Sequence, residues 1–261
     1  MLLRVSFMKL AYRFFIAIIA ATASWTALAA DKASANRGSA AHPKGQYAAL
    51  DKLPDWGGIW VLKINRDAVR ERPALKGRYL EQHQAFVRAE EANKGNMARG
   101  ASNCLPPGVP GIMGTAQYPT EFLFTPGRVT MLHEAWMQWR IVFTDGRGHA
   151  EDMEASFNGD SIGHWEGDTL VIETVGIKPS VELTRGMRHS EQLRIVERIH
   201  LAKDDPDTLI NEMTAEDPLA LEKPWRNVTQ YRRMREGTLI EFICAENDRN
   251  PVDESGRSKF E

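Results

Sequence analysis

The stretch Phe157–Gly176, FNGDSIGHWEGDTLVIETVG, decides the fold of this chain. It contains two β-prone arms, Ser161–Glu166 and Thr169–Val175, on either side of the dipeptide Gly167-Asp168. A Gly-Asp pair between such arms signals a two-residue hairpin, because glycine accepts the positive φ that the turn requires. The stretch therefore predicts one tight antiparallel hairpin.

The two-residue turn also determines which residues of the hairpin share a face. Glu166 then lies opposite Thr169, and each step away from the turn pairs the next two residues. Because side chains alternate along a strand, His164 and Glu173 fall on one face and Trp165 falls on the other. The face with Trp165 is the more apolar, so the face with His164 and Glu173 is directed either to solvent or into a binding cavity.

Turn signals separate further β-prone runs along the chain. Thr125-Pro126-Gly127 and Asp145-Gly146 mark two turns, and Gly237 lies where a three-residue hairpin loop requires a glycine. An anchoring first strand is expected near Trp56 and Trp60. The other expected strands outside the central hairpin are 121–124, 128–133, 139–144, 191–201, 208–216, 227–234 and 238–244.

This pattern favours an all-β, lipocalin-like antiparallel meander barrel of about nine or ten strands with one helix. A β-sandwich is the alternative, but it needs the long crossovers of a Greek key, and local hairpins outnumber them in this chain. A barrel of this size is wide enough to hold one small ligand.

The barrel is expected to form a single domain at 51–246. A stripe of apolar residues at helical spacing predicts one helix at 75–93, packed on the barrel wall or rim, and Gly95 ends it. Residues 30–50 are rich in Ala, Ser, Lys and Gly and predict a flexible leader. The polar segment 247–261 predicts a frayed tail.

The first 29 residues have the pattern of a secretory signal peptide. Arg4, Lys9 and Arg13 form a basic region, Phe14–Ala23 is apolar, and Ala27-Leu28-Ala29 is a small-x-small cleavage site. The apolar run is too short for a spanning helix, so no membrane span is expected after cleavage. The protein is therefore expected to be periplasmic or secreted, and an uncleaved anchor is the alternative.

Charge and motifs exclude several classes of partner and cofactor. The signal segment holds three of the 33 basic residues and none of the 35 acidic ones, so its removal leaves a net negative chain. Such a chain is not expected to bind nucleic acid or an anionic membrane. No glycine-rich phosphate loop opens a helix, and no His spacing is diagnostic of a metal site. We therefore expect no cofactor and no metal.

Two motifs concern single residues. Gly159–Gly163 matches the G-x-S-x-G pattern, but a hydrolase nucleophile requires a following helix, and here a strand follows Ser161. Cys104 and Cys244 are the two cysteines of the chain. In an exported protein an even pair predicts one disulfide, and two buried thiols are the alternative.

The string Ser161-Ile162-Gly163-x-Trp165-Glu166-Gly167-Asp168-Thr169-Leu170-Val171 resembles a signature in a large group of exported bacterial proteins. The resemblance covers most of 54–247. The motifs shared in order include Cys-x-Pro-x-Gly at 104–108, Thr-Pro-Gly at 125–127, Thr-Asp-Gly-Arg at 144–147, His-Ser-Glu-x-Leu-Arg at 189–194, Pro-Trp at 224–225 and Cys-x-Glu at 244–246. The group has no assigned function, so the resemblance implies an exported barrel and supplies no catalytic residues.

The central hairpin supplies a candidate catalytic pair. His164 and Glu173 lie diagonally across its two strands, within reach of long side chains. A carboxylate beside an imidazole fixes the tautomer of the ring and raises its basicity, as a general base requires. We take His164 as the base and Glu173 as the residue that orients it. The candidate ligand-binding residues are Trp165, Arg140, His189 and Trp225.

Two functions from different classes fit these observations. The first is a cofactor-independent enzyme of the lyase, isomerase or hydratase type, which acts on a small hydrophobic molecule in the barrel and needs only an acid-base pair. The second is a periplasmic protein that binds or carries such a molecule without catalysis. Fold alone does not decide between them.

Overall fold

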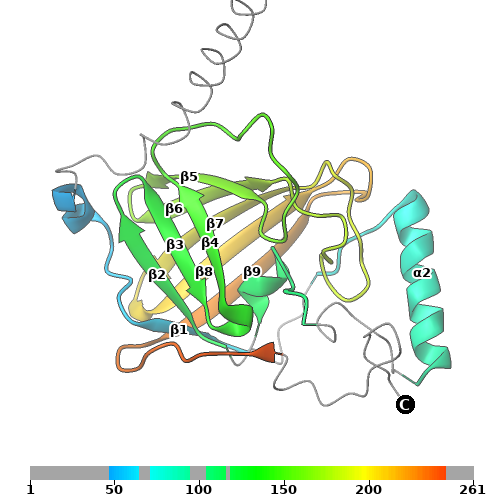
Figure 1. Ribbon diagram of the computed structural model, residues 1–261, viewed down its shortest axis with the longest axis horizontal. Helices are drawn as coiled ribbons and strands as arrows, with labels where there is room; N and C mark the ends of the chain where they lie inside the picture. Colours follow the sequence, from blue (N-terminus) through cyan, green and yellow to red (C-terminus); the bar gives the residue numbers. More distant parts are fainter. Residues whose placement is uncertain (1–46, 65–70, 95–103, 116–117, 245–261) are drawn as a thin grey trace, which may run out of the picture. The chain divides into compact units, whose positions relative to one another are not determined.

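Nine β-strands close into one barrel in the computed structural model (Figure 1). The structure describes residues 47–64, 71–94, 104–115 and 118–244. The predicted signal peptide at 1–29, most of the predicted leader at 30–50 and the predicted tail at 247–261 lie outside these residues. The end of the leader forms an exposed 3-10 helix, η1 (Tyr47–Lys52).

Neighbouring strands in the barrel follow the order of the chain. Every neighbouring pair is antiparallel except β4 and β5, and β9 pairs with β1 to close the barrel. The prediction of an all-β, lipocalin-like meander barrel is therefore confirmed, and the sandwich alternative is wrong. The strands are β1 (Ile59–Leu62), β2 (Thr120–Thr125), β3 (Arg128–His133), β4 (Gln138–Phe143), β5 (Asp160–Glu166), β6 (Thr169–Val175), β7 (Arg194–Ala202), β8 (Asp205–Glu216) and β9 (Trp225–Met234).

The central hairpin has the predicted turn and the predicted register. Gly167 has a φ of 59°, and Glu166 lies opposite Thr169. Farther from the turn, His164 lies opposite Val171. The face with Trp165 points into the barrel, because Leu170, which lies opposite Trp165, is fully buried. The apolar face of this hairpin is thus the inner face, as burial of apolar surface favours.

One strand prediction is wrong, and one connection departs from the hairpins of a pure meander. Residues 238–244 form no strand, because β9 is already paired along both edges, with β8 on one side and β1 on the other. The connection 144–159 carries the chain back along the barrel, so that β5 starts beside β4 in the same direction. A parallel neighbour requires such a crossover, whereas the predicted meander has only hairpins.

The helix predicted at 75–93 is α2 (Gly77–Ala92). It packs on the rim of the barrel through loops at one end. Leu75, just before the helix, pairs with Leu221 of the β8–β9 loop, and Glu90 forms an ion pair with Arg185 of the β6–β7 loop at 2.5 Å. The loops β3–β4, β6–β7 and β8–β9 gather at this end of the barrel. We call it the loop end.

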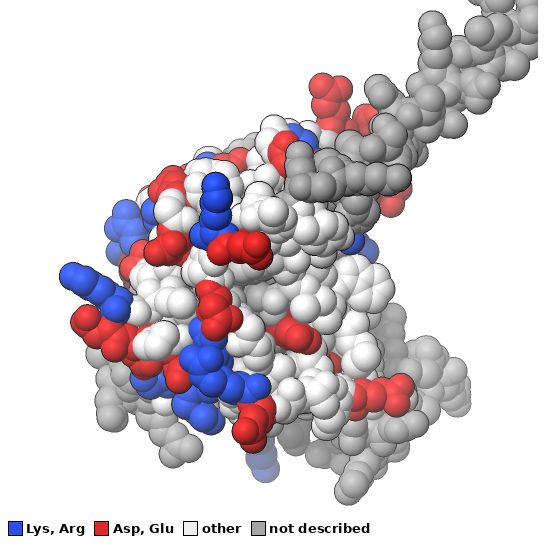
Figure 2. Space-filling view, turned by 90° about the vertical axis from the view of Figure 1, so that its left-hand side faces the viewer, with Lys and Arg blue, Asp and Glu red and all other residues white. Residues whose placement is uncertain are grey.

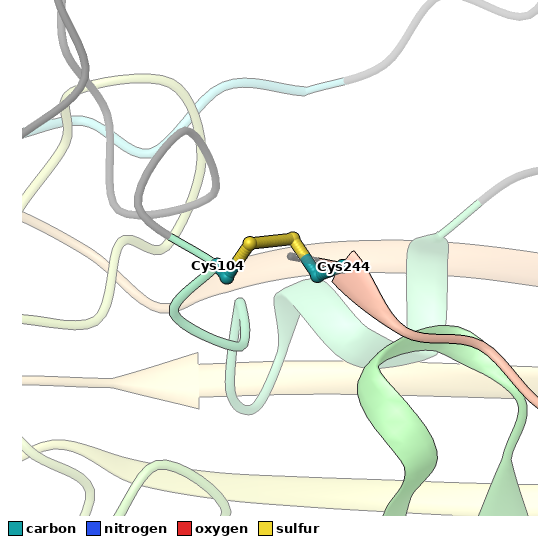
Figure 3. Close-up of a disulfide and its surroundings, with 2 residues drawn as sticks. All are labelled: Cys104 and Cys244. Carbon is teal, nitrogen blue, oxygen red and sulfur yellow. A yellow bond between two sulfur atoms is a disulfide. The ribbon is translucent and has the colours of Figure 1, made fainter. Parts of the chain in front are cut away.

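The predicted disulfide is present between Cys104 and Cys244, with Cα atoms 5.5 Å apart (Figure 3). It joins the Pro-rich segment 104–115 to the chain after β9. That segment contains the 3-10 helix η3 (Gly111–Gly114), whose Ile112 is 3% exposed. Tyr231 of β9 donates its hydroxyl hydrogen to the carbonyl of Met113, so the segment contacts an inner-face residue of the barrel.

The opposite end of the barrel carries the tight turns after β2 and β5 and is called the turn end. Trp56, Phe124 and Trp165 meet there in edge-to-face contacts with ring centroids 5.3–5.4 Å apart. Trp56 is 2% exposed, so this aromatic cluster fills the turn end with apolar side chains.

Candidate binding site inside the barrel

The inner wall of the barrel carries a cluster of buried polar side chains. Alternation along each strand places them among apolar residues, and every strand from β2 to β9 contributes at least one. We call this set the polar cluster. Its members are Thr120, His133, Arg140, Ser161, Thr174, Glu197, Asn211 and Tyr231.

A salt bridge between Arg140 and Glu197 forms the centre of the polar cluster. Their side chains are 1% and 2% exposed, so the pair is removed from water. The Nε of Arg140 donates to the hydroxyl of Ser161 at 3.2 Å, and its Nη2 donates to the hydroxyl of Thr174 at 2.7 Å. Ser161 and Thr174 lie opposite each other on β5 and β6, so strand register positions both hydroxyls for one guanidinium.

The second oxygen of Glu197 binds Asn211. The side-chain amide nitrogen of Asn211 donates to Oε1 of Glu197 at 2.8 Å, whereas Arg140 binds Oε2. Both oxygens of the carboxylate are therefore occupied, as a buried charge requires. Nearby, burial raises the pKa of Tyr231, and the charge of Glu197 adds to this effect. The phenol of Tyr231 is thus protonated.

His133 provides a neutral imidazole within the same cluster. Its Nδ1 forms a hydrogen bond with the hydroxyl of Thr120 at 2.9 Å. Burial and, to a lesser extent, the positive charge of Arg140 together lower the pKa of His133 to about 3. The ring is therefore uncharged at neutral pH.

Three buried polar atoms of the cluster have no hydrogen-bond partner among the described residues. They are Nη1 of Arg140, Nε2 of His133 and Oδ1 of Asn211. Arg140 and Asn211 bind the two oxygens of one carboxylate, so their side chains are neighbours on the inner wall. Buried polar groups almost always have a partner, and leaving one unsatisfied costs about 1–3 kcal/mol. These atoms are therefore the part of the inner wall that a bound polar group would satisfy.

Apolar side chains surround the polar cluster on the inner wall. Inward positions next to it along the strands are occupied by Met131, Val142, Ile195 and Leu209, and all four are fully buried. A group bound at the free polar atoms would thus be polar at one point and apolar elsewhere, which is the usual composition of a small-molecule site.

The predicted pair of His164 and Glu173 does not face a cavity. The side chain of His164 is 65% exposed on the outer wall, and its Nε2 forms a 3.1 Å contact with Glu166. Glu173 instead binds Arg194 and lies 3.3 Å from Nε2 of His149. The prediction that the two residues form a cavity-facing pair is wrong, because the apolar face of the hairpin is the one that turns inward.

Of the four predicted ligand-binding residues, Arg140 alone belongs to the polar cluster. Trp165 is part of the aromatic cluster at the turn end. His189 lies buried at the loop end, where its Nδ1 donates to the carbonyl of Ser190 at 2.7 Å and burial lowers its pKa. Trp225 donates its indole N–H to the carbonyl of Glu71 at 2.8 Å, and so fastens the segment before α2.

Several residues of the cluster are not predicted from the sequence, although a signal for them exists. For Glu197 and Asn211 the signal is a polar residue whose neighbours two before and two after are apolar and inward. Glu197 stands between Ile195 and Ile199, and Asn211 stands between Leu209 and Met213. The unpredicted members with chemistry of their own are His133, Glu197, Asn211 and Tyr231.

The outer surface has a different character from the inner wall. Figure 2 shows acidic and basic side chains interspersed on one face of the molecule. Several of the surface charges pair locally, such as Arg198 with Glu166 at 2.7 Å. A groove on the outer wall of β7–β9 is lined in part by Val196, Arg198 and Glu212. It faces outward, whereas the polar cluster faces the inside of the barrel. None of the buried unpartnered polar atoms of the described residues lines this groove, so the inner wall is taken as the candidate site.

Comparisons with known proteins assign no family to this chain. No protein-family model matches the chain, and a search of curated proteins finds no match.

Within the described ranges, no three His, Cys, Asp or Glu side chains gather as metal ligands would. Among the same residues, no helix is both long and apolar enough to cross a membrane.

Proposed function

We propose that this protein is an exported carrier that binds one small, mostly hydrophobic molecule inside its β-barrel. The proposal rests on three buried polar atoms that have no partner among the described residues and that belong to a polar cluster with apolar side chains around it. A bound molecule with a hydrogen-bonding group would satisfy them and would bury its apolar part against the surrounding side chains.

The charge states of the polar cluster support binding rather than strong acid-base catalysis. A general base is most effective when its pKa lies near the working pH. The pKa of His133 is lowered to about 3, and that of Tyr231 is raised by burial. Each group is thus held in its neutral form, which suits recognition of a ligand.

A cofactor-independent lyase, isomerase or hydratase is the second candidate, and one observation favours it. The neutral ring of His133 lies close enough to Arg140 for the charge of the guanidinium to lower its pKa. A free ring nitrogen beside a fixed cation is a combination that can polarise a carbonyl or stabilise a developing oxyanion.

Export is part of the proposal. The predicted signal peptide supports it, and so does the disulfide between Cys104 and Cys244, because such bonds persist in oxidising compartments. N-terminal sequencing of periplasmic protein is expected to begin at Ala30 or Asp31. An intact N-terminus beginning at Met1 or Met8 would contradict export.

The test is mass spectrometry of the exported protein under native and then denaturing conditions. We expect a small organic molecule in a ratio of about one per chain, released on denaturation. The variant His133→Asn keeps a hydrogen-bonding group toward Thr120 and removes Nε2, and we expect it to retain less of the molecule. His164→Asn, on the outer wall, is the matched control. Protein without any bound molecule, together with failure to take up added hydrophobic compounds, would refute the carrier.

Incubation of the released molecule with the protein separates the two candidate functions. A carrier returns the molecule with its mass and structure unchanged. Conversion to an isomer, or to a product that has gained or lost water, would favour the enzyme.

A further inference from the structure

We propose that the inner site selects a neutral molecule that bears a hydroxyl group, an alcohol or a phenol, and rejects the corresponding carboxylic acid. This inference rests on the proposed binding function and names the class of ligand. It follows from the charges and the hydrogen-bonding roles of the polar cluster.

The charge of the site is already balanced without a ligand. Arg140 is the cation of the cluster, and Glu197 is bound to it with both side chains removed from water. An anionic ligand would therefore add an uncompensated charge to a buried site, which is costly in the low-dielectric interior. A neutral ligand adds none.

The free atoms of the site require a ligand group that both accepts and donates a hydrogen. Nη1 of Arg140 is a donor and Oδ1 of Asn211 is an acceptor. A hydroxyl group can accept from the guanidinium and donate to the amide oxygen at the same time. A ketone or an ether can only accept, and it would leave the oxygen of Asn211 unsatisfied.

The third free atom completes this recognition. Nε2 of His133 takes either role, according to whether Nδ1 accepts from or donates to the hydroxyl of Thr120. Nε2 can therefore donate to the second lone pair of the ligand hydroxyl or accept the hydrogen of that hydroxyl. The inward-facing Met131, Ile195 and Leu209 provide the apolar surface for the rest of the molecule.

The test compares three probes with the same ring system at pH 7: 2-naphthol, 2-naphthoate and naphthalene. Binding is measured by competition with the molecule that co-purifies, or by naphthol fluorescence for protein stripped of it. We expect naphthol to bind at least about tenfold more tightly than naphthoate, because the anion brings an uncompensated charge into a buried site. Naphthalene should bind less tightly than naphthol, because it leaves the three polar atoms unsatisfied.

One variant should shift the preference toward the anion. Glu197→Gln removes the charge that balances Arg140, so naphthoate should gain affinity relative to naphthol. His164→Asn should leave all three affinities unchanged. If Glu197→Gln does not fold, the preference of the wild-type protein decides the question.

The outcomes separate this inference from the proposed function. Naphthoate binding as tightly as naphthol, or more tightly, overturns the ligand class and leaves the carrier standing. Equal binding of naphthol and naphthalene overturns the role of the polar atoms. Failure of all three probes to bind overturns the ligand class, and the carrier itself falls if no molecule co-purifies either.

Discussion

The substitution Glu197→Gln tests the energetics of the polar cluster. It leaves the shape of the side chain nearly unchanged and removes one charge, so Arg140 is left buried without a counter-ion. Both side chains are at most 2% exposed, so water does not screen the change. Breaking a buried ion pair by removing one partner costs about 3–5 kcal/mol, because it leaves an uncompensated buried charge.

The assay is urea denaturation of the protein at pH 7 with the disulfide intact. We expect the free energy of unfolding to fall by about 3–5 kcal/mol in Glu197→Gln. The double variant Arg140→Met, Glu197→Leu should recover at least half of that loss, because it removes both charges together. Glu166→Gln, in the exposed pair with Arg198, should change little. A loss below about 1 kcal/mol in Glu197→Gln would refute the buried charge pair as the centre of the site.

Three further predictions concern the covalent link, the backbone and pH. Replacing both Cys104 and Cys244 by serine opens a link across 140 residues and should lower the free energy of unfolding by about 2–5 kcal/mol in urea denaturation. Gly108→Ala should lower the thermal midpoint, because Gly108 has a φ of 65° and a Cβ there would lie 2.3 Å from the carbonyl oxygen of Phe157. Folding lowers the pKa of His133 from 6.5 to about 3, so below pH 6.5 the unfolded chain binds a proton that the folded chain does not. Stability measured by denaturation should therefore fall as pH falls from 6.5 toward 3, by at most about 1.4 kcal/mol per pH unit from this group.

Matched variants provide the controls for these three predictions. Gly146 has a φ of 83° and open space at its Cβ position, so Gly146→Ala should cost less than Gly108→Ala; equal costs would contradict the close contact. His133→Asn should flatten the acid limb of the stability curve, whereas His164→Asn should not. Unchanged stability of the serine double variant would show that the disulfide constrains nothing.

The fold is predictable from the sequence where structure is local. The register of the central hairpin follows from Gly167-Asp168 alone, because a two-residue turn permits one pairing of its arms. The last strand shows the limit. A run at 238–244 has strand composition, but β9 has no free edge for it, and edge availability depends on the closure of the whole barrel.

The candidate site is less predictable because it depends on which face of each strand turns inward. The central hairpin has two faces, and the sequence analysis places the site on the face of His164 and Glu173. That face is the less apolar one, and in the structure the more apolar face turns inward. The sequence analysis predicts Arg140 as a ligand-binding residue but does not predict its partners. They lie on strands far along the chain, and Glu197 is 57 residues away. A polar residue between inward apolar neighbours, as at Asn211, is the local signal that indicates such a cluster.

The most direct measurement is a crystal structure of the protein purified together with any molecule that it retains. We expect density for a non-protein molecule within hydrogen-bonding distance of Nη1 of Arg140 and Oδ1 of Asn211, with its apolar part against the inner wall. Density showing only isolated water molecules at these atoms, with side chains filling the remaining interior, would contradict it.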